Sequence, residues 1–147
     1  MSHKVYLAGA ISYWYKENQI EKATKWRERA EEYFENDCFG FNCINPMRYY
    51  SVGDNYHTSN HEPMRFDLRK VKESRVVLVN LEALDKSLGT SDEILYAFLN
   101  GIPIVGFLED KSLLHTIHEW KNVQIDRIED GKGAQERAME YIKYFYG

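Results

Sequence analysis

Small hydroxyl side chains and a carboxylate follow the most apolar run of the chain. Ser87, Gly89, Thr90 and Ser91 lead into a stretch that is predicted to be helical, and Glu93 lies in its first turn. Hydroxyls and backbone N–H groups at a helix N-terminus bind anions and sugar oxygens, and the helix dipole favours an ionised carboxylate there. The segment therefore predicts a site for an anion or a sugar, with Glu93 as a candidate catalytic carboxylate.

The same spacing also has a purely structural interpretation. Thr90 and Glu93 fit a capping box, in which the side chain of Glu93 bonds back to the Thr90 backbone and does no chemistry. Both interpretations stay open on these residues alone. Asn80, at which the turn begins, is a further candidate for binding a ligand.

Asp67 is a second carboxylate in an unusual place. If residues 63–73 form a helix, Met64, Leu68 and Val71 form its buried stripe, and Asp67 lies within that stripe. Burial would raise the pKa of Asp67 and let it hold a proton near neutral pH, which suits a general acid. The alternative is an Asp at the edge of the stripe, paired in solvent with a basic neighbour. Three are close in sequence: Arg65, Arg69 and Lys70.

The first apolar run ends in a turn that holds a single glycine, Gly9. A dinucleotide-binding fingerprint needs three glycines, so a Rossmann NAD site is not supported. A small residue after a buried strand still lets the backbone approach a ligand, and Tyr6 lies near the end of that strand. The alternative for Tyr6 is a core residue whose hydroxyl is bonded within the protein.

Apolar runs typical of strands alternate with amphipathic stretches typical of helices. Strands are predicted at residues 4–10, 40–45, 75–81, 102–108 and 123–128. Helices are predicted at residues 17–36, 63–73, 91–100, 112–120 and 134–145. The alternation predicts an α/β fold with a single, doubly wound, mostly parallel five-stranded sheet, flavodoxin-like or Rossmann-like, with helices on both faces. The run at 75–81 is the most strand-like in the chain and is apolar on both faces, which is typical of a central strand. Ligands bind such sheets at the carboxyl ends of the strands.

Composition narrows the functions further. The 147 residues are 44% hydrophobic and carry a formal net charge of -4. This length predicts one domain over residues 1–147 that needs no disulfides or structural metal. The charge argues against a nucleic-acid polymer as partner. Two cysteines, Cys38 and Cys43, predict reduced and buried thiols, and the short N-terminal apolar run predicts neither a signal peptide nor a membrane span. We expect a cytoplasmic protein that requires no metal and no organic cofactor.

Five motifs in register resemble the nucleoside 2-deoxyribosyltransferase family and its 2′-deoxynucleoside 5′-phosphate N-hydrolase relatives. They are Val-Tyr-Leu-Ala-Gly-Ala-Ile at 5–11, Asn45-Pro46, Asp67-Leu68, Ser-x-Gly-Thr-x-x-Glu-Ile-x-Tyr-Ala at 87–97, and Gly101-x-Pro103. The resemblance implies cleavage or exchange of the nucleobase of a 2′-deoxynucleoside or its 5′-monophosphate. It makes Glu93 the nucleophile, Asp67 the acid and base at the nucleobase, and Tyr6 the partner that orients Glu93.

One departure bears on the substrate. Family transferases that act on unphosphorylated nucleosides carry an Asp where this chain has Ser87, whereas the 5′-monophosphate N-hydrolases resemble this chain there. A carboxylate would repel a 5′ phosphate and a hydroxyl would bind it. The resemblance thus favours a nucleoside monophosphate, with Ser87, the Gly89 backbone and Ser12 around the phosphate. Asp85 lies nearby and could take the transferase role instead.

The long polar and aromatic stretch at 47–60 is a candidate wall of the base pocket. Its flat side chains are Tyr49, Tyr50, Tyr56 and His57. Arg48 adds a positive charge, and Asn45, two residues before the stretch, is a further candidate for binding the substrate. The alternative is that these residues cover the sheet edge or a subunit contact.

In family members a neighbouring subunit often completes the pocket, and His115 is a candidate for reaching a neighbour's phosphate, although a lone His is often only surface or core filling. The aromatic tail at 141–146 suggests a subunit contact. We therefore predict a homo-oligomer, a dimer or higher.

Three classes of function remain open on the sequence. The first is an N-glycosyl enzyme that uses Glu93 and Asp67. The second is a nucleotide-binding or sensor module that keeps the pocket without turnover. The third is another phosphate-ligand enzyme on the same architecture, because fold does not fix function.

Overall fold

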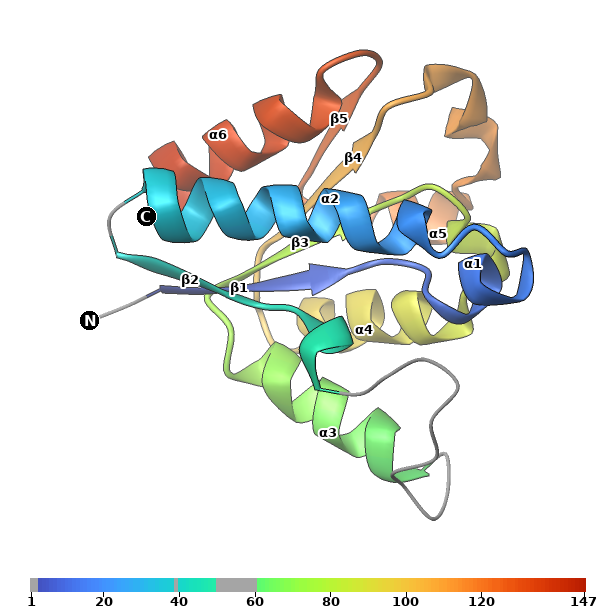
Figure 1. Ribbon diagram of the computed structural model, residues 1–147, viewed down its shortest axis with the longest axis horizontal. Helices are drawn as coiled ribbons and strands as arrows, with labels where there is room; N and C mark the ends of the chain where they lie inside the picture. Colours follow the sequence, from blue (N-terminus) through green and yellow to red (C-terminus); the bar gives the residue numbers. More distant parts are fainter. Residues whose placement is uncertain (1–2, 39, 50–60) are drawn as a thin grey trace.

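The structure, a computed structural model, describes residues 3–38, 40–49 and 61–147. Its centre is a parallel five-stranded sheet with the order β2-β1-β3-β4-β5 (Figure 1). The strands are β1 (His3–Ala8), β2 (Phe41–Ile44), β3 (Val76–Asn80), β4 (Ile104–Leu108) and β5 (Arg127–Asp130). The predicted α/β sheet is confirmed, and so is the central place of the run at 75–81.

Helices cover both faces of the sheet (Figure 1). One face carries α2 (Glu21–Glu31) and α6 (Ala134–Tyr146), and the other carries α3 (His61–Lys72) and α4 (Leu88–Leu99). The shorter elements are α1 (Ser12–Lys16), α5 (Glu119–Asn122), a π-helical turn η1 (Glu32–Asp37), and the 3₁₀ turns η2 (Pro46–Arg48), η3 (Leu84–Lys86) and η4 (Lys111–Thr116).

Alternation along the strands divides the core into two layers. In β3, Val76 and Leu78 pack toward α2 and α6, while Val77 and Val79 pack toward α3 and α4. Successive side chains of a strand point to opposite faces, so both faces of this strand must be apolar. The same alternation places Tyr6 of β1 in the α3/α4 layer.

The predicted helix at 17–36 is wrong at its start, and it changes type before its end. A separate helix, α1, precedes it, and a turn with Asn18 in the left-handed conformation (φ 56) separates the two. Asn tolerates this conformation better than most residues, which makes it a common turn former. At the other end, regular α-helix stops at Glu31 and continues as the π-helical turn η1.

The predicted helix at 112–120 is also wrong. The chain forms the 3₁₀ turn η4, then takes up extended backbone at Ile117, and only α5 follows. Asp110 starts η4 because its carboxylate accepts hydrogen bonds from the backbone and hydroxyl of Ser112. This local bonding competes with a regular helix. The strand predicted at 123–128 is displaced and begins only at Arg127.

Cys38 is buried and Cys43 is half-buried, and both are free thiols. Within residues 3–38, 40–49 and 61–147, no helix is long and apolar enough to span a bilayer.

Candidate active site

Tyr6 and Glu93 meet on the α3/α4 face of the sheet. Tyr6 is fully buried in β1, and its hydroxyl donates a hydrogen bond to Oε2 of Glu93. The two residues are 87 positions apart in sequence. The Glu93 side chain therefore points from α4 toward the end of β1, where ligands bind in folds of this type.

Ser87, not Thr90, caps the helix that carries Glu93. The Ser87 Oγ accepts a hydrogen bond of 3.3 Å from the Thr90 backbone N–H and lies 2.7 Å from the Thr90 hydroxyl. The helix consequently starts at Leu88, three residues before the predicted start at 91. The capping-box interpretation with Thr90 as cap is wrong, because Ser87 takes that place and Glu93 bonds Tyr6 instead.

Asp67 lies in α3, which packs against α4. The residue is half-buried, and its negative charge is close enough to Glu93 to raise the pKa of that carboxyl. The predicted buried stripe is narrower than expected, since Val71 is fully buried but Met64 is 46% exposed. The structure thus brings the two predicted acids into one neighbourhood.

The surroundings of Glu93 favour its neutral form. Burial, more than any other cause, raises the pKa of Glu93 to about 8, and the charges of Asp67 and Asp92 act in the same direction. The hydrogen bond from Tyr6 and the positive charge of Arg27 oppose this shift. Glu93 therefore titrates close to neutral pH, as acids and bases at functional sites often do.

Arg27 is the residue of this cluster that the sequence analysis missed. It is fully buried in α2, and burial lowers the pKa of its guanidinium to about 10, while the charges of Glu93, Tyr6 and Asp67 raise it. A signal was present, because Arg27 lies four residues after the buried Ala23 on the apolar side of its helix. A cation on such a side needs partners, as Asp67 does in α3.

Close packing explains why position 9 is a glycine. A Cβ atom at this position would lie 3.0 Å from the ring of Trp26 and 3.4 Å from the guanidinium of Arg27. The glycine therefore lets α2 approach the end of β1. Its predicted part in substrate binding stays a prediction.

A cavity of about 320 Å³ lies at the start of α4. Ser87 and Ser91 line it together with Lys86, His118 and Lys121. The ammonium of Lys121 donates to the Ser91 carbonyl at 2.7 Å, which holds its charge at this cavity. The sequence analysis did not single out His118 or Lys121.

His115 was singled out instead, but it does not line this cavity. It is exposed on η4, and its Nδ1 lies 2.9 Å from the Ser112 carbonyl oxygen. Two other predicted phosphate contacts, Ser12 and Gly89, are exposed in the first turns of α1 and α4.

The segment after β2 is fixed by local bonds. Asn45 is buried, and its Oδ1 accepts from the Met47 backbone N–H at 3.0 Å. Arg48 forms an ion pair with Glu31 at 2.6 Å, which raises the pKa of the arginine. Tyr49 is exposed and packs edge-on against Phe66. Three further residues singled out in this stretch lie outside the described residues: Tyr50, Tyr56 and His57.

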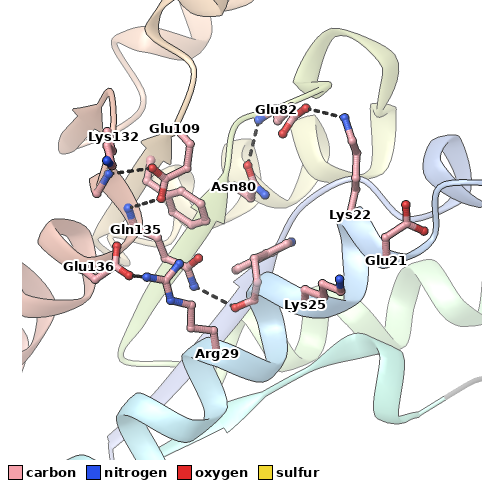
Figure 2. A pocket seen from close by; sticks show the side chains of 13 residues that line it. Glu21, Lys22, Lys25, Arg29, Asn80, Glu82, Glu109, Lys132, Gln135 and Glu136 are labelled. Carbon is pink, nitrogen blue, oxygen red and sulfur yellow. Dashed lines mark hydrogen bonds and ion pairs between the residues drawn. The ribbon is translucent and has the colours of Figure 1, made fainter.

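Asn80 lies on the opposite face of the sheet from Glu93. It lines a cavity of about 690 Å³ between α2 and α6, where its Oδ1 accepts from the Glu82 backbone N–H (Figure 2). Four of the eight charged side chains at this cavity form ion pairs with one another. The pairs are Lys22 with Glu82 and Arg29 with Glu136, and Glu109 accepts from the first backbone N–H groups of α6. The structure does not bring Asn80 together with the two acids.

Solved structures share this arrangement of strands and helices. A CMP N-glycosidase, BcmB, from Clostridium botulinum is 19% identical, with a TM-score of 0.60 over 97% of this chain and 99% of that chain. The fold is thus one that an N-glycosidase uses. A conserved protein from Enterococcus faecalis V583 is 17% identical, with a TM-score of 0.73 over 98% and 99% of the two chains. A de novo designed Rossmann 2x3 protein also matches, with 10% identity and a TM-score of 0.51 over 100% and 94%.

These likenesses establish the fold of the chain and no more. No protein-family model and no curated protein sequence matches it. A designed protein with the same fold illustrates that the architecture alone does not carry an activity. Within the part of the chain that the structure describes, no three His, Cys, Asp or Glu side chains gather where they could hold a metal ion.

Proposed function

We propose that this protein is an N-glycosyl enzyme that cleaves or exchanges the nucleobase of a 2′-deoxynucleoside or its 5′-monophosphate. The observation that carries the proposal is the hydrogen bond from Tyr6 to Glu93, in a half-buried neighbourhood that includes Asp67. Cleavage of an N-glycosidic bond needs a fixed carboxylate at the sugar and a proton donor at the base. The motif resemblance assigns these tasks to the same residues, and the fold is shared with an N-glycosidase.

In the first step the Glu93 carboxylate attacks the anomeric carbon. A bond forms between a carboxylate oxygen and C1′, while the bond between C1′ and the base nitrogen breaks and its electron pair leaves with the base. Asp67 delivers a proton to the departing base, so that the base leaves neutral. The developing positive charge on the sugar is stabilised by the nearby carboxylate.

In the second step the ester between Glu93 and the sugar is opened. For hydrolysis, water attacks C1′ and gives a proton to the Asp67 carboxylate, which restores both acids. For transfer, the nitrogen of a second base attacks C1′ and gives its proton to Asp67 in the same way. The two reactions therefore need the same residues and differ only in the attacking molecule.

Ser87 supports the 5′-monophosphate as the preferred substrate. Its hydroxyl lines the cavity at the start of α4 with two lysines, Lys86 and Lys121, and with His118, and the carboxylate of Asp85 lines the same cavity. Phosphate oxygens accept strong hydrogen bonds from lysine ammonium groups. BcmB, which shares the fold, is named a CMP N-glycosidase, and CMP is a nucleoside monophosphate.

The test is release of free base from a panel of deoxynucleosides and their 5′-monophosphates, separated by liquid chromatography. We expect the wild type to release base, and Glu93→Ala and Asp67→Asn to lower the rate at least 100-fold, as loss of a nucleophile or a general acid does. Glu28→Gln is the matched control, because Glu28 is exposed on α2. Adding a second base separates transfer from hydrolysis.

Two outcomes would contradict the proposal. If the wild type binds nucleotides but releases no base from any member of the panel, the nucleotide-binding module is the better description. If Glu93→Ala retains the wild-type rate, the nucleophile is wrong.

A further inference from the structure

Arg27 reaches from one face of the sheet to the end of β1. It belongs to α2, yet its Nε donates to the Leu7 carbonyl at 3.3 Å and its Nη2 to the Gly9 carbonyl at 2.9 Å. Its Nη1 donates to the Ala23 carbonyl within its own helix at 2.8 Å. Because Arg27 is fully buried, these bonds are not shared with solvent.

The two bonded carbonyls lie at and just beyond the end of β1, on the C-terminal side of Tyr6. Leu7 follows Tyr6 directly, and Gly9 opens the turn after the strand. A planar guanidinium that holds both carbonyls fixes the end of the strand, since its donors have a rigid fork geometry. Tyr6 in turn donates to Glu93. A continuous chain of contacts thus runs from Arg27 to the carboxylate.

The charged groups around Glu93 also point to Arg27. Four groups act electrostatically on Glu93 from the elements around it: Tyr6 from β1, Asp67 from α3, Asp92 from α4 and Arg27 from α2. Arg27 is the cation among them. Charges interact strongly where water is excluded, so a buried cation favours an anion nearby more than an exposed one would.

We propose that Arg27 is a positioning residue for the Tyr6–Glu93 pair. Arg27 holds the end of β1 in place and supplies the buried positive charge that keeps Glu93 available as an anion. The inference rests on the proposed function for its effect on catalysis. The charge coupling between Arg27 and Glu93 is a property of the free protein and is testable without a substrate.

The first experiment measures the titration of the Glu93 carboxyl carbon by NMR in the wild type, Arg27→Met and Arg27→Lys. Methionine removes the charge and has a side chain of similar length, whereas lysine keeps the charge but lacks the forked guanidinium. We expect Arg27→Met to raise the midpoint by about one pH unit, and Arg27→Lys to leave it near the wild-type value. Arg29→Met is the matched control, because Arg29 is an exposed arginine of the same helix that pairs with Glu136.

The second readout is the pH profile of base release. If Glu93 must be an anion, Arg27→Met loses about tenfold at pH 7 and much less at pH 10, because the midpoint shift alone changes the anionic fraction by that factor. An equal loss for Met and Lys at every pH, with an unchanged midpoint, would overturn the proposal and leave Arg27 a purely structural residue.

A measurement on the wild type tests the proposal even if the Arg27 variants do not fold. The Nε–H signal of Arg27 should shift with the same midpoint as the Glu93 carboxyl, and a flat signal through that pH range overturns the coupling. Absence of base release by the wild type would refute the proposed function, whereas an uncoupled Arg27 in an active enzyme would refute only this inference.

Discussion

Glu93 should lower the free energy of unfolding as pH rises above the pKa of 4.5 that its carboxyl has in an unfolded chain, and Glu93→Gln should recover that loss. The carboxyl has an ordinary pKa of 4.5 in an unfolded chain, and burial raises the pKa to about 8 in the folded protein. Below the lower value the group is protonated in both states and contributes no difference. As pH rises through this window the unfolded chain loses its proton first, so the folded state loses stability until the pH passes the higher value.

The magnitude follows from the width of the window. A difference between 4.5 and about 8 corresponds to about 5 kcal/mol at roughly 1.4 kcal/mol for each pH unit. Glu93 is only half-buried, and solvent screening reduces the expected effect to about 2–3 kcal/mol. Gln is neutral at every pH, and its amide oxygen can still accept the hydrogen bond from Tyr6.

Urea unfolding between pH 4 and pH 9 measures the difference directly. The buried tryptophans Trp14 and Trp26 provide a fluorescence signal for the folded state. We expect Glu93→Gln and the wild type to be close at pH 4, and the variant to gain stability steadily up to pH 8. Glu28→Gln, an exposed control, should give a difference that does not change with pH. A flat difference for Glu93→Gln as well would refute the raised pKa.

Three other predictions test the site and the assembly. Tyr6→Phe removes a hydrogen bond that favours the Glu93 anion, so the rise of kcat/KM with pH should move to higher pH; an unmoved profile contradicts the proposed orienting role. Ser87→Asp keeps a good helix cap but adds a negative charge, so cleavage of monophosphates should fall more than cleavage of nucleosides, and equal losses would count against a phosphate role. Trp120 is 72% exposed and Phe145 is 68% exposed, and we expect sedimentation to show a dimer or larger species; a monomer at all concentrations contradicts the predicted assembly.

The parts of the fold that were predictable are those with a strong hydrophobic period. In the run at 75–81, the four residues Val76 to Val79 are apolar on both faces, and the run forms the central strand β3. The errors fall where short polar side chains bond to the local backbone. Asp110 directs a 3₁₀ turn and Ser87 advances the start of α4, and neither effect shows in the spacing of apolar residues.

The candidate site was predictable in part for a related reason. Asp67 and Glu93 stand out because carboxylates near apolar faces or helix starts need an explanation, and they do share a neighbourhood. Arg27 escaped notice because a helical arginine is ordinarily a solvent-facing residue. Asn80 was misplaced relative to the acids because the direction of its side chain depends on the register of β3, and a change of one residue moves a side chain to the other face of the sheet.

The position of Glu93 combines two opposed requirements of a nucleophilic carboxylate. Partial burial strengthens the interaction of a carboxylate with the cationic sugar of the transition state, but the same burial favours the protonated form, which cannot attack. Tyr6 and Arg27 oppose the effect of burial, and the resulting pKa of about 8 lies near neutral pH instead of far above it. These two residues come from β1 and α2, whereas Glu93 and Asp67 come from α4 and α3. The balance thus depends on residues from both helix layers of the fold, which β1 brings together.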